Sequence, residues 1–472
     1  MSGAGPEAPD RVERLRRASA PVVALLAAAL GLTCLLGMPF AFATLAELAA
    51  IDSRFVGWIG VGVLVSVGTA ATSLLALDRV GAGPPLALGA TAGVVALALG
   101  HHILGRHQLT FAIVVAGFAV GALLGGVVGM TSALPGRWAR PAAAAWAVSL
   151  LAVWPVLVRL SPRGRPTSPS VVVHPAAWML VVATVAILGW SVLTMLVEPV
   201  RPPRPRLPSS AESWWALLLV CAVVLLLTTM LGFDPQISLV WLRPIVILAT
   251  AALGVGWALI VLVLATASRL AFVGATVVAG LVPTTVTLAV AVVNQPAGGV
   301  SVSVVMALGA ATVAGGVVGS RGRSAAVPFG LAVTALAAVA GWVMSDSPWL
   351  MLGAVAPLLA AAAVVLVGSL QLVVTDPEAS RLIGFAVICA VVVGGVVAVP
   401  LSWAMLGDVP TGLADIRAAG RLYAGLTVAA SSLAAAWTWV LRRRLLSTTS
   451  RARSSSAFAH FPGAVLEDSS RW

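Results

Sequence analysis

The sequence of 472 residues contains no lysine, and only 9% of its residues are charged, whereas 60% are apolar. Soluble domains carry about 25% charged residues, because a surface that faces water needs ionic groups. The low charge and a mean hydropathy of +1.05 exclude a soluble enzyme, a nucleic-acid-binding domain and a disordered chain. The net charge of +12 comes from arginine alone. In a membrane protein this excess is typical of arginines that flank helices on the cytoplasmic side. We therefore predict a polytopic membrane protein.

Metal and catalytic motifs are also lacking. The three cysteines, Cys34, Cys221 and Cys389, lie inside apolar runs, so the sequence encodes neither a disulfide framework nor a Cys-x-x-Cys metal site. It has no nucleotide-binding glycine loop and no His-Glu-x-x-His motif. It also lacks the pair of outer-loop acids that a lipid-linked glycosyltransferase would need. We predict that the protein is not an enzyme and needs no metal or cofactor.

Apolar runs of about 20 residues recur along the chain, and such a run is long enough to cross about 30 Å of hydrocarbon as a helix. The runs are continuously apolar, unlike barrel strands, which are shorter and alternate. We predict an all-α fold with about 14 transmembrane helices, at 21–43, 56–77, 84–104, 109–130, 141–160, 175–197, 213–232, 244–267, 270–293, 301–320, 327–345, 348–370, 382–406 and 421–441.

Arginine counts predict the orientation. With the N-terminus inside, the inner segments hold 20 arginines and the outer segments eight, although the loop at 161–165 opposes this trend. The positive-inside rule then places both termini in the cytoplasm and the chain in the plasma membrane. No cleavage site follows the arginines of the first segment, so the first span is predicted to be an anchor.

A proline- and arginine-rich segment at 199–212 cannot be helical and divides the chain. The predicted layout is a six-helix bundle, a linker, a two-helix insertion and a second six-helix bundle, a 6+2+6 arrangement. Parallel repeats of this kind are found in many secondary transporters. The predicted boundaries are 1–19 for the N-terminal tail, 20–198, 199–212, 213–268 and 269–441 for these four parts, and 442–472 for the C-terminal tail.

Two short basic loops occupy equivalent positions, each after the second helix of its bundle. The first contains Asp78, Arg79 and Gly81, and the second contains Arg321, Gly322 and Arg323. Matching loops in equivalent positions favour a repeat. The alternative is that each loop is only a positive-inside tether.

Three further groups of residues are candidates for packing, cargo binding or proton coupling, and each has a plainer interpretation. A glycine at every fourth position of the fourth span predicts close helix packing, or else a sliding face. Hydroxyls, prolines and two tryptophans inside spans predict a cavity lining, and the alternative for the hydroxyls is that they bond back to their own helix. Polar residues near the outer ends predict proton coupling, or simply interfacial side chains. The packing candidates are Gly117, Gly121, Gly125 and Gly129. The cavity candidates are Trp146, Trp154, Pro155, Pro283, Thr284, Thr285 and Thr287. The proton-coupling candidates are Glu47, His101 and His102.

The window from Leu74 to Gly83 resembles the motif between helices two and three of the major facilitator superfamily, in its 14-helix branch of drug–proton antiporters. Asp78, Arg79 and Gly81 match that motif. The resemblance extends to two further loops, through Arg137 and Arg140 before Trp146 and through Asp376 and Arg381 before the thirteenth span. It implies two six-helix bundles with an extra central pair. It also implies that Asp78 and Arg79 brace the inner gate in the first half and that Arg321 and Arg323 do so in the second; the alternative is that these residues only stabilise the geometry of the loops.

The sequence departs from that family where proton coupling is concerned. The helix-four arginine of the family falls at Gly117, and the glycine–proline pair of helix five reads Trp154-Pro155. The leading hypothesis is an exporter of a hydrophobic or amphipathic small molecule that works by alternating access, as in multidrug efflux. The alternatives are a transporter-like scaffold that moves no cargo and a lipid-linked oligosaccharide flippase. The expected partners are the lipid bilayer and a hydrophobic small molecule, with no nucleic acid.

Overall fold

The computed structural model describes residues 7–49, 55–101, 106–160, 170–197, 265–294, 302–343, 348–375 and 413–459, with Ile383, Gly384, Ala386, Val387 and Ala390. These ranges are almost wholly helical, which confirms the predicted all-α fold. The first half comprises α1 (Glu7–Ala49), α2 (Phe55–Val80), α3 (Gly83–His101), α4 (Arg106–Ala133), α5 (Gly136–Leu160) and α6 (Ser170–Val197). The second comprises α9 (Thr266–Asn294), α10 (Val302–Gly322), a 3-10 turn η1 (Arg323–Ala325), α11 (Ala326–Val343), α12 (Pro348–Thr375) and α14 (Leu413–Ala459). The linker 199–212, the span 213–232 and most of 244–267 and 382–406 lie outside the described residues.

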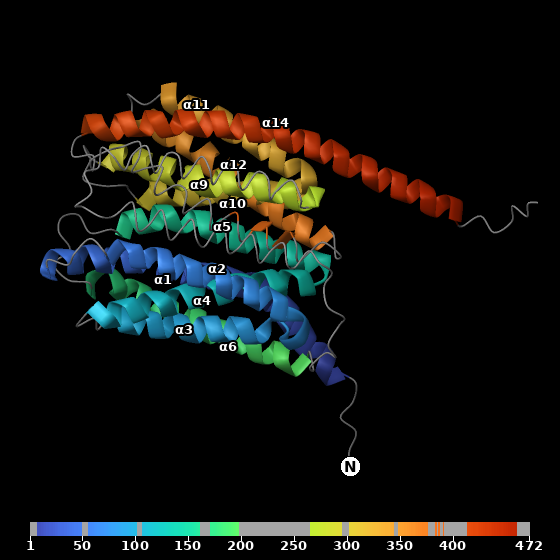
Figure 1. Ribbon diagram of the computed structural model, residues 1–472, viewed down its shortest axis with the longest axis horizontal. Helices are drawn as coiled ribbons and strands as arrows, with labels where there is room; N and C mark the ends of the chain where they lie inside the picture. Colours follow the sequence, from blue (N-terminus) through green and yellow to red (C-terminus); the bar gives the residue numbers. More distant parts are fainter. Residues whose placement is uncertain are drawn as a thin grey trace, which may run out of the picture.

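The two halves repeat one pattern of helix packing (Figure 1). In the first half α4 packs against α1, α2 and α3, and α6 packs against α1 and α3. In the second half α12 packs against α9, α10 and α11, and α14 packs against α9 and α11. In this packing α1, α2, α3, α4 and α6 thus correspond to α9, α10, α11, α12 and α14. This duplication is the two-bundle architecture that the paired loops predict.

The central helix of each half is apolar and the most enclosed. All residues at 119–131 of α4 and at 361–373 of α12 are buried, and neither stretch contains a charged residue. The outer helices instead expose large apolar side chains, such as Leu196 on α6, Met306 on α10 and Leu336 on α11. An apolar exterior of this kind suits contact with lipid tails.

Four stretches in the described part of the chain are long and apolar enough to cross a membrane, namely Phe111–Ala133, Ser303–Gly322, Gly353–Val373 and Arg417–Thr448. Shorter apolar helical stretches occur at Gly83–Leu99, Val181–Val197, Thr266–Val282 and Ala326–Trp342. These findings rest on length and composition, and they agree with several of the predicted spans.

Most helices are a few residues longer than the predicted spans, and two extend by many residues. α1 begins at Glu7, inside the predicted N-terminal tail, and ion pairs join Glu13 to Arg16 and Arg17, one turn further along. Such pairs support a helix beyond the apolar core. α14 continues to Ala459, past position 441, where the second bundle was predicted to end. Hydropathy marks where a helix meets water, and a helix can continue beyond that boundary.

Glycine permits the closest helix contacts in both halves. The predicted glycine face of α4 lies against α2, where a Cβ at Gly117 would overlap the carbonyl oxygen of Gly62 and one at Gly121 would overlap that of Ser66. Gly125 and Gly129 continue the same face toward Ser73 and Leu77 of α2. In the second half the glycines lie on the other member of the corresponding pair. Gly315 of α10 meets the backbone of α12 at Ala360, and Gly319 meets it at Val364.

Candidate transport interface

Helix α5 joins the two halves. It packs against α1 and α4 of its own half and against α9, α10 and α12 of the other (Figure 1). Its buried residues recur with helical spacing, which gives one continuous apolar face: Ala139, Ala142, Ala143, Trp146, Ala147 and Leu151. The helix starts at a tight turn, where the carbonyl of Pro135 accepts hydrogen bonds from the backbone N–H groups of Trp138 and Ala139.

Near the middle of α5, Val148 packs on Gly316 of α10. A Cβ at Gly316 would lie 2.5 Å from Cγ2 of Val148, so a larger residue there requires the side chain of Val148 or one of the two helices to move. Gly316 therefore allows the two halves to approach closely. The contact is apolar and holds the halves together without a fixed polar bond.

A second set of contacts closes the interface on the tail side, the side where α1 begins and α14 ends. The side-chain Nε2 of Gln371 on α12 donates a hydrogen bond of 3.4 Å to the backbone carbonyl of Arg140 on α5. Gln371 is buried. A further contact on the tail side joins Gly384 of the second half to the side chain of Val128, which lies near the tail-side end of α4. Both contacts would have to break for the halves to separate on this side.

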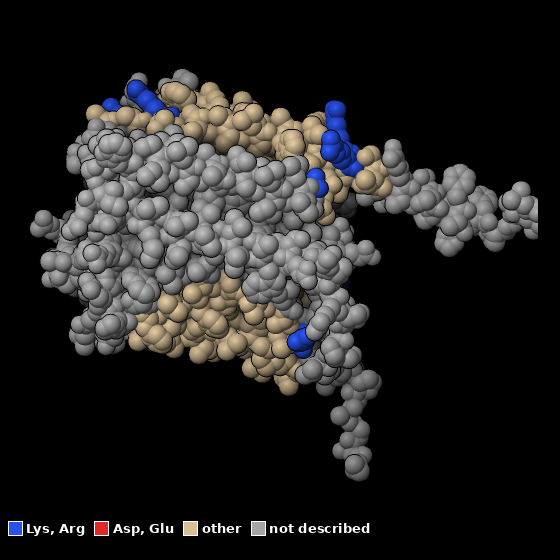
Figure 2. Space-filling model, in the orientation of Figure 1, with Lys and Arg blue, Asp and Glu red and all other residues tan. Residues whose placement is uncertain are grey.

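Among the described side chains, the charged ones lie toward the two ends of the bundle. On the face shown in Figure 2, blue arginine side chains appear toward the two ends of the bundle, and the tan surface between them carries none. Among arginines with described side chains, only Arg417 and Arg421, at the start of α14, lie opposite the tail side. Partial burial raises the pKa of Glu13, but hydrogen bonds and charge from Arg16 and Arg17 outweigh it and hold that pKa below its ordinary value.

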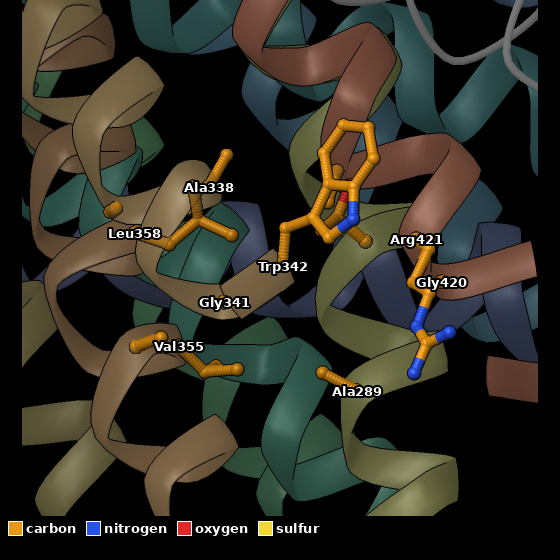
Figure 3. Close-up of a pocket in the computed structure, with 12 residues that line it drawn as sticks. Ala289, Ala338, Gly341, Trp342, Val355, Leu358, Gly420 and Arg421 are labelled. Carbon is orange, nitrogen blue, oxygen red and sulfur yellow. The ribbon is translucent and has the colours of Figure 1, made fainter. Parts of the chain in front are cut away.

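A small pocket lies within the second half, between α9, α11, α12 and α14, rather than between the halves (Figure 3). Its volume is about 30 Å³, far less than a drug-sized ligand needs. Thr285 borders it, bonds back to the carbonyl of Leu281 and lies 3.2 Å from the hydroxyl oxygen of Thr427. Thr285 is thus a packing contact between α9 and α14 and also part of the pocket wall.

The two predicted gate loops both lie on the tail side, because consecutive helices alternate in direction. Gly81 has a φ of 72°, and its N–H bonds to the carbonyl of Leu77, which is an αL cap that ends α2. Gly322 ends α10 differently, since the chain continues into η1. Arg79 and Arg321 are exposed, whereas the side chains of Asp78 and Arg323 lie outside the described part.

The remaining predicted site residues divide into two groups. Arg137 and Arg140 lie in the first turns of α5, and Trp146 is buried in its core face. Three of the others, His102, Asp376 and Arg381, lie outside the described residues. The rest lie in described helices, but their side chains are outside the described part: Glu47, His101, Trp154, Pro155, Pro283, Thr284 and Thr287.

Sequence reasoning missed Gln371 and Gly316. Gln371 carries no charge, so a criterion based on ionisable groups does not select it. It is nevertheless a polar amide within the apolar run 364–374. Gly316 lies in the run Ala314-Gly315-Gly316, whose excess of small residues is a recognisable sign of close packing.

Two halves with the same pattern of helix packing, joined at an apolar interface along α5, define a helical membrane protein built from two similar bundles. No protein-family model and no curated protein matches the sequence. Among solved structures, the chain is similar to a partially occluded, inward-open form of the xylose transporter XylE from E. coli, with 14% identity and a TM-score of 0.54 over 90% of this chain and 98% of that one. It is equally similar to the human organic anion transporter MFSD10, with 15% identity and a TM-score of 0.54 over 89% of this chain and 99% of that one. The chain therefore has the fold of major facilitator transporters.

Proposed function

We propose that the protein is a membrane transporter that works by alternating access, with α1–α6 rocking against α9–α14. The observation that carries this proposal is the interface at α5, where apolar packing and a long hydrogen bond of 3.4 Å from Gln371 join two halves of equivalent construction. Contacts of this kind can break and re-form at low cost. Alternating access in transporters built from repeats is largely a rigid-body movement of one repeat against the other.

We further propose that the cargo is a hydrophobic or amphipathic small molecule and that the protein exports it, as a member of the 14-helix branch. Among the described side chains the only buried charged one is Arg16, which lies near the tail-side end of α1. A charged sugar phosphate or peptide would need buried counter-charges, because an unpaired charge in a dry interior is costly. The distribution of arginines supports a tail side that faces the cytoplasm of a plasma membrane.

Transport into proteoliposomes tests this function. We expect the wild-type protein to move a fluorescent lipophile at least several times faster than empty liposomes, with an imposed pH gradient as one of the conditions. Asp78→Ala should remove most of this difference, since Asp78 matches the gate motif. Absence of movement across a broad panel of lipophiles, together with a partner that co-purifies stably, would instead favour the scaffold hypothesis.

Gln371→Leu is expected to weaken closure on the tail side. The lost hydrogen bond contributes about 0.5–1.5 kcal/mol, so the tail-side-open population should rise roughly two- to twelvefold. The measurement is the rate at which a membrane-impermeant thiol reagent, added from the tail side, labels a cysteine placed at Val148 in a cysteine-free background. Ser369→Ala is the matched control on α12, because Ser369 bonds only within its own helix, to the carbonyl of Val365. Equal labelling rates in all three proteins would mean that Gln371 does not restrain the opening.

A further inference from the structure

The tail-side end of α14 leaves the bundle and has unusual chemistry. Leu441 is the last buried residue among the described side chains of the helix, and Leu445 is only partly packed against the core. From Leu446 to Thr448 every side chain is exposed. Figure 1 shows α14 projecting beyond the ends of the neighbouring helices. This part of the helix therefore passes from the bundle into the surroundings of the membrane surface.

The helical turns before this point present an apolar and aromatic surface. Leu433 is 74% exposed, Trp437 48% and Trp439 45%. Indole rings at the ends of spans commonly lie at the level of the lipid headgroups. The two tryptophans thus place the boundary between lipid tails and headgroups close to residue 439, immediately before the arginines of residues 442–444.

Two guanidinium groups lie over the ring of Trp439. The Cζ atom of Arg442 lies 5.3 Å from the ring centroid and that of Arg443 5.7 Å, because residues three and four positions apart share a helix face. Two like charges beside one ring repel each other. Arg442 also has a buried Nε atom without a hydrogen-bond partner among the described residues.

No acidic side chain balances this charge within the described part of the chain. The one acid with a described side chain is Glu13, which lies on α1 in the other half and is paired with Arg16 and Arg17. An anion near the guanidinium groups would reduce their repulsion and accept their hydrogen bonds. Phosphate suits this geometry, because the planar guanidinium fork binds it in a bidentate manner.

We propose that Trp439, Arg442, Arg443 and Arg444, the α14 basic cluster, bind the phosphate headgroup of an anionic phospholipid in the tail-side leaflet. The exposed Val440, three positions before Arg443 and thus on the same helix face, would contact the acyl chains of the same lipid, as would the ring of Trp439, whereas Trp437 lies on the opposite face of α14. This apolar surface beside the cations is why a phospholipid suits the cluster better than free phosphate. The proposal requires only that the chain lies in a bilayer, so it stands or falls independently of transport.

The test is lipid titration of the purified full-length protein, followed by native mass spectrometry. Wild type should bind its first dioleoyl phosphatidylglycerol at least tenfold more tightly than dioleoyl phosphatidylcholine. The variant R442Q/R443Q/R444Q should lose most of this preference, since each arginine near an anionic surface contributes about fivefold in affinity. The matched control is R417Q/R421Q, which removes two arginines from the opposite end of the same helix and should keep the preference.

Three outcomes would overturn the proposal. The first is an unchanged lipid preference in the triple variant, and the second is an equal loss in the control variant. The third is binding of inorganic phosphate as tight as that of phosphatidylglycerol, which would assign the cluster to a soluble anion. Trp439→Ala provides a second measurement that keeps all the charges. It should weaken phosphatidylglycerol binding severalfold, while Trp437→Phe should have little effect, and thermal unfolding checks that every variant is folded.

Discussion

Oxidation of a cysteine pair at Val148 and Gly316 is expected to stop transport, and reduction is expected to restore it. A Cβ at Gly316 would lie 2.5 Å from Cγ2 of Val148, and one bond of about 1.5 Å separates that atom from the Cβ of Val148, so the two Cβ atoms are within about 4 Å. Disulfides need a Cβ–Cβ distance of about 3.5–4.5 Å. A bond at this point would tie α5 to α10 and prevent the halves from separating. In a background free of native cysteines, uptake by proteoliposomes should fall more than about tenfold.

A second cysteine pair controls for the chemistry of oxidation. A Cβ at Gly341 of α11 would lie 3.6 Å from that of Ala354 on α12, so G341C/A354C should also form a disulfide. Both residues belong to the second half, and their bond would leave movement between the halves free. The control should therefore transport at a similar rate before and after oxidation. Undiminished transport by fully cross-linked V148C/G316C would contradict a rocking mechanism.

The sequence predicts helices and their duplication better than it predicts which helices touch. Apolar runs and arginine flanks locate the described spans, because both follow directly from the cost of placing charge in hydrocarbon. Equivalent loops at Arg79 and Arg321 indicate two repeats. The role of α5 is different, since its packing against α10 and α12 depends on surfaces that are far apart in the sequence. No local pattern specifies that pairing.

Single residues show the same difference between what a local pattern predicts and what depends on the packing partner. The periodic glycines of α4 predict a close approach, but a bare helix face fits several partners, and only the structure identifies α2. The hydroxyl of Thr285 bonds back to its own helix, and the same residue borders the small pocket of the second half, so the two interpretations do not exclude each other. Gln371 was missed because its amide carries no charge, yet an amide buried between two halves is as specific as an ion pair.

The close glycine contacts of the two halves should be equally sensitive to a single methyl group. A Cβ at Gly117 would overlap the carbonyl oxygen of Gly62, and one at Gly315 would lie 2.7 Å from the Cα atom of Ala360. In both positions the neighbouring atoms are backbone, which cannot rotate away, so the helices must separate. Overpacking of this kind costs about 1–3 kcal/mol. Gly117→Ala and Gly315→Ala should therefore each lower the thermal unfolding midpoint by several degrees.

Gly189→Ala separates this effect from the helix propensity of alanine. Nothing lies within 4 Å of a Cβ at Gly189, an exposed residue of α6, so alanine should leave the unfolding midpoint unchanged or raise it. The measurement is thermal unfolding in one detergent, followed by tryptophan fluorescence. The contact between α2 and α4 corresponds to the contact between α10 and α12. Gly117→Ala and Gly315→Ala should therefore destabilise the protein by similar amounts. A loss in only one of them would mean that the halves share a packing pattern without sharing its energetic basis.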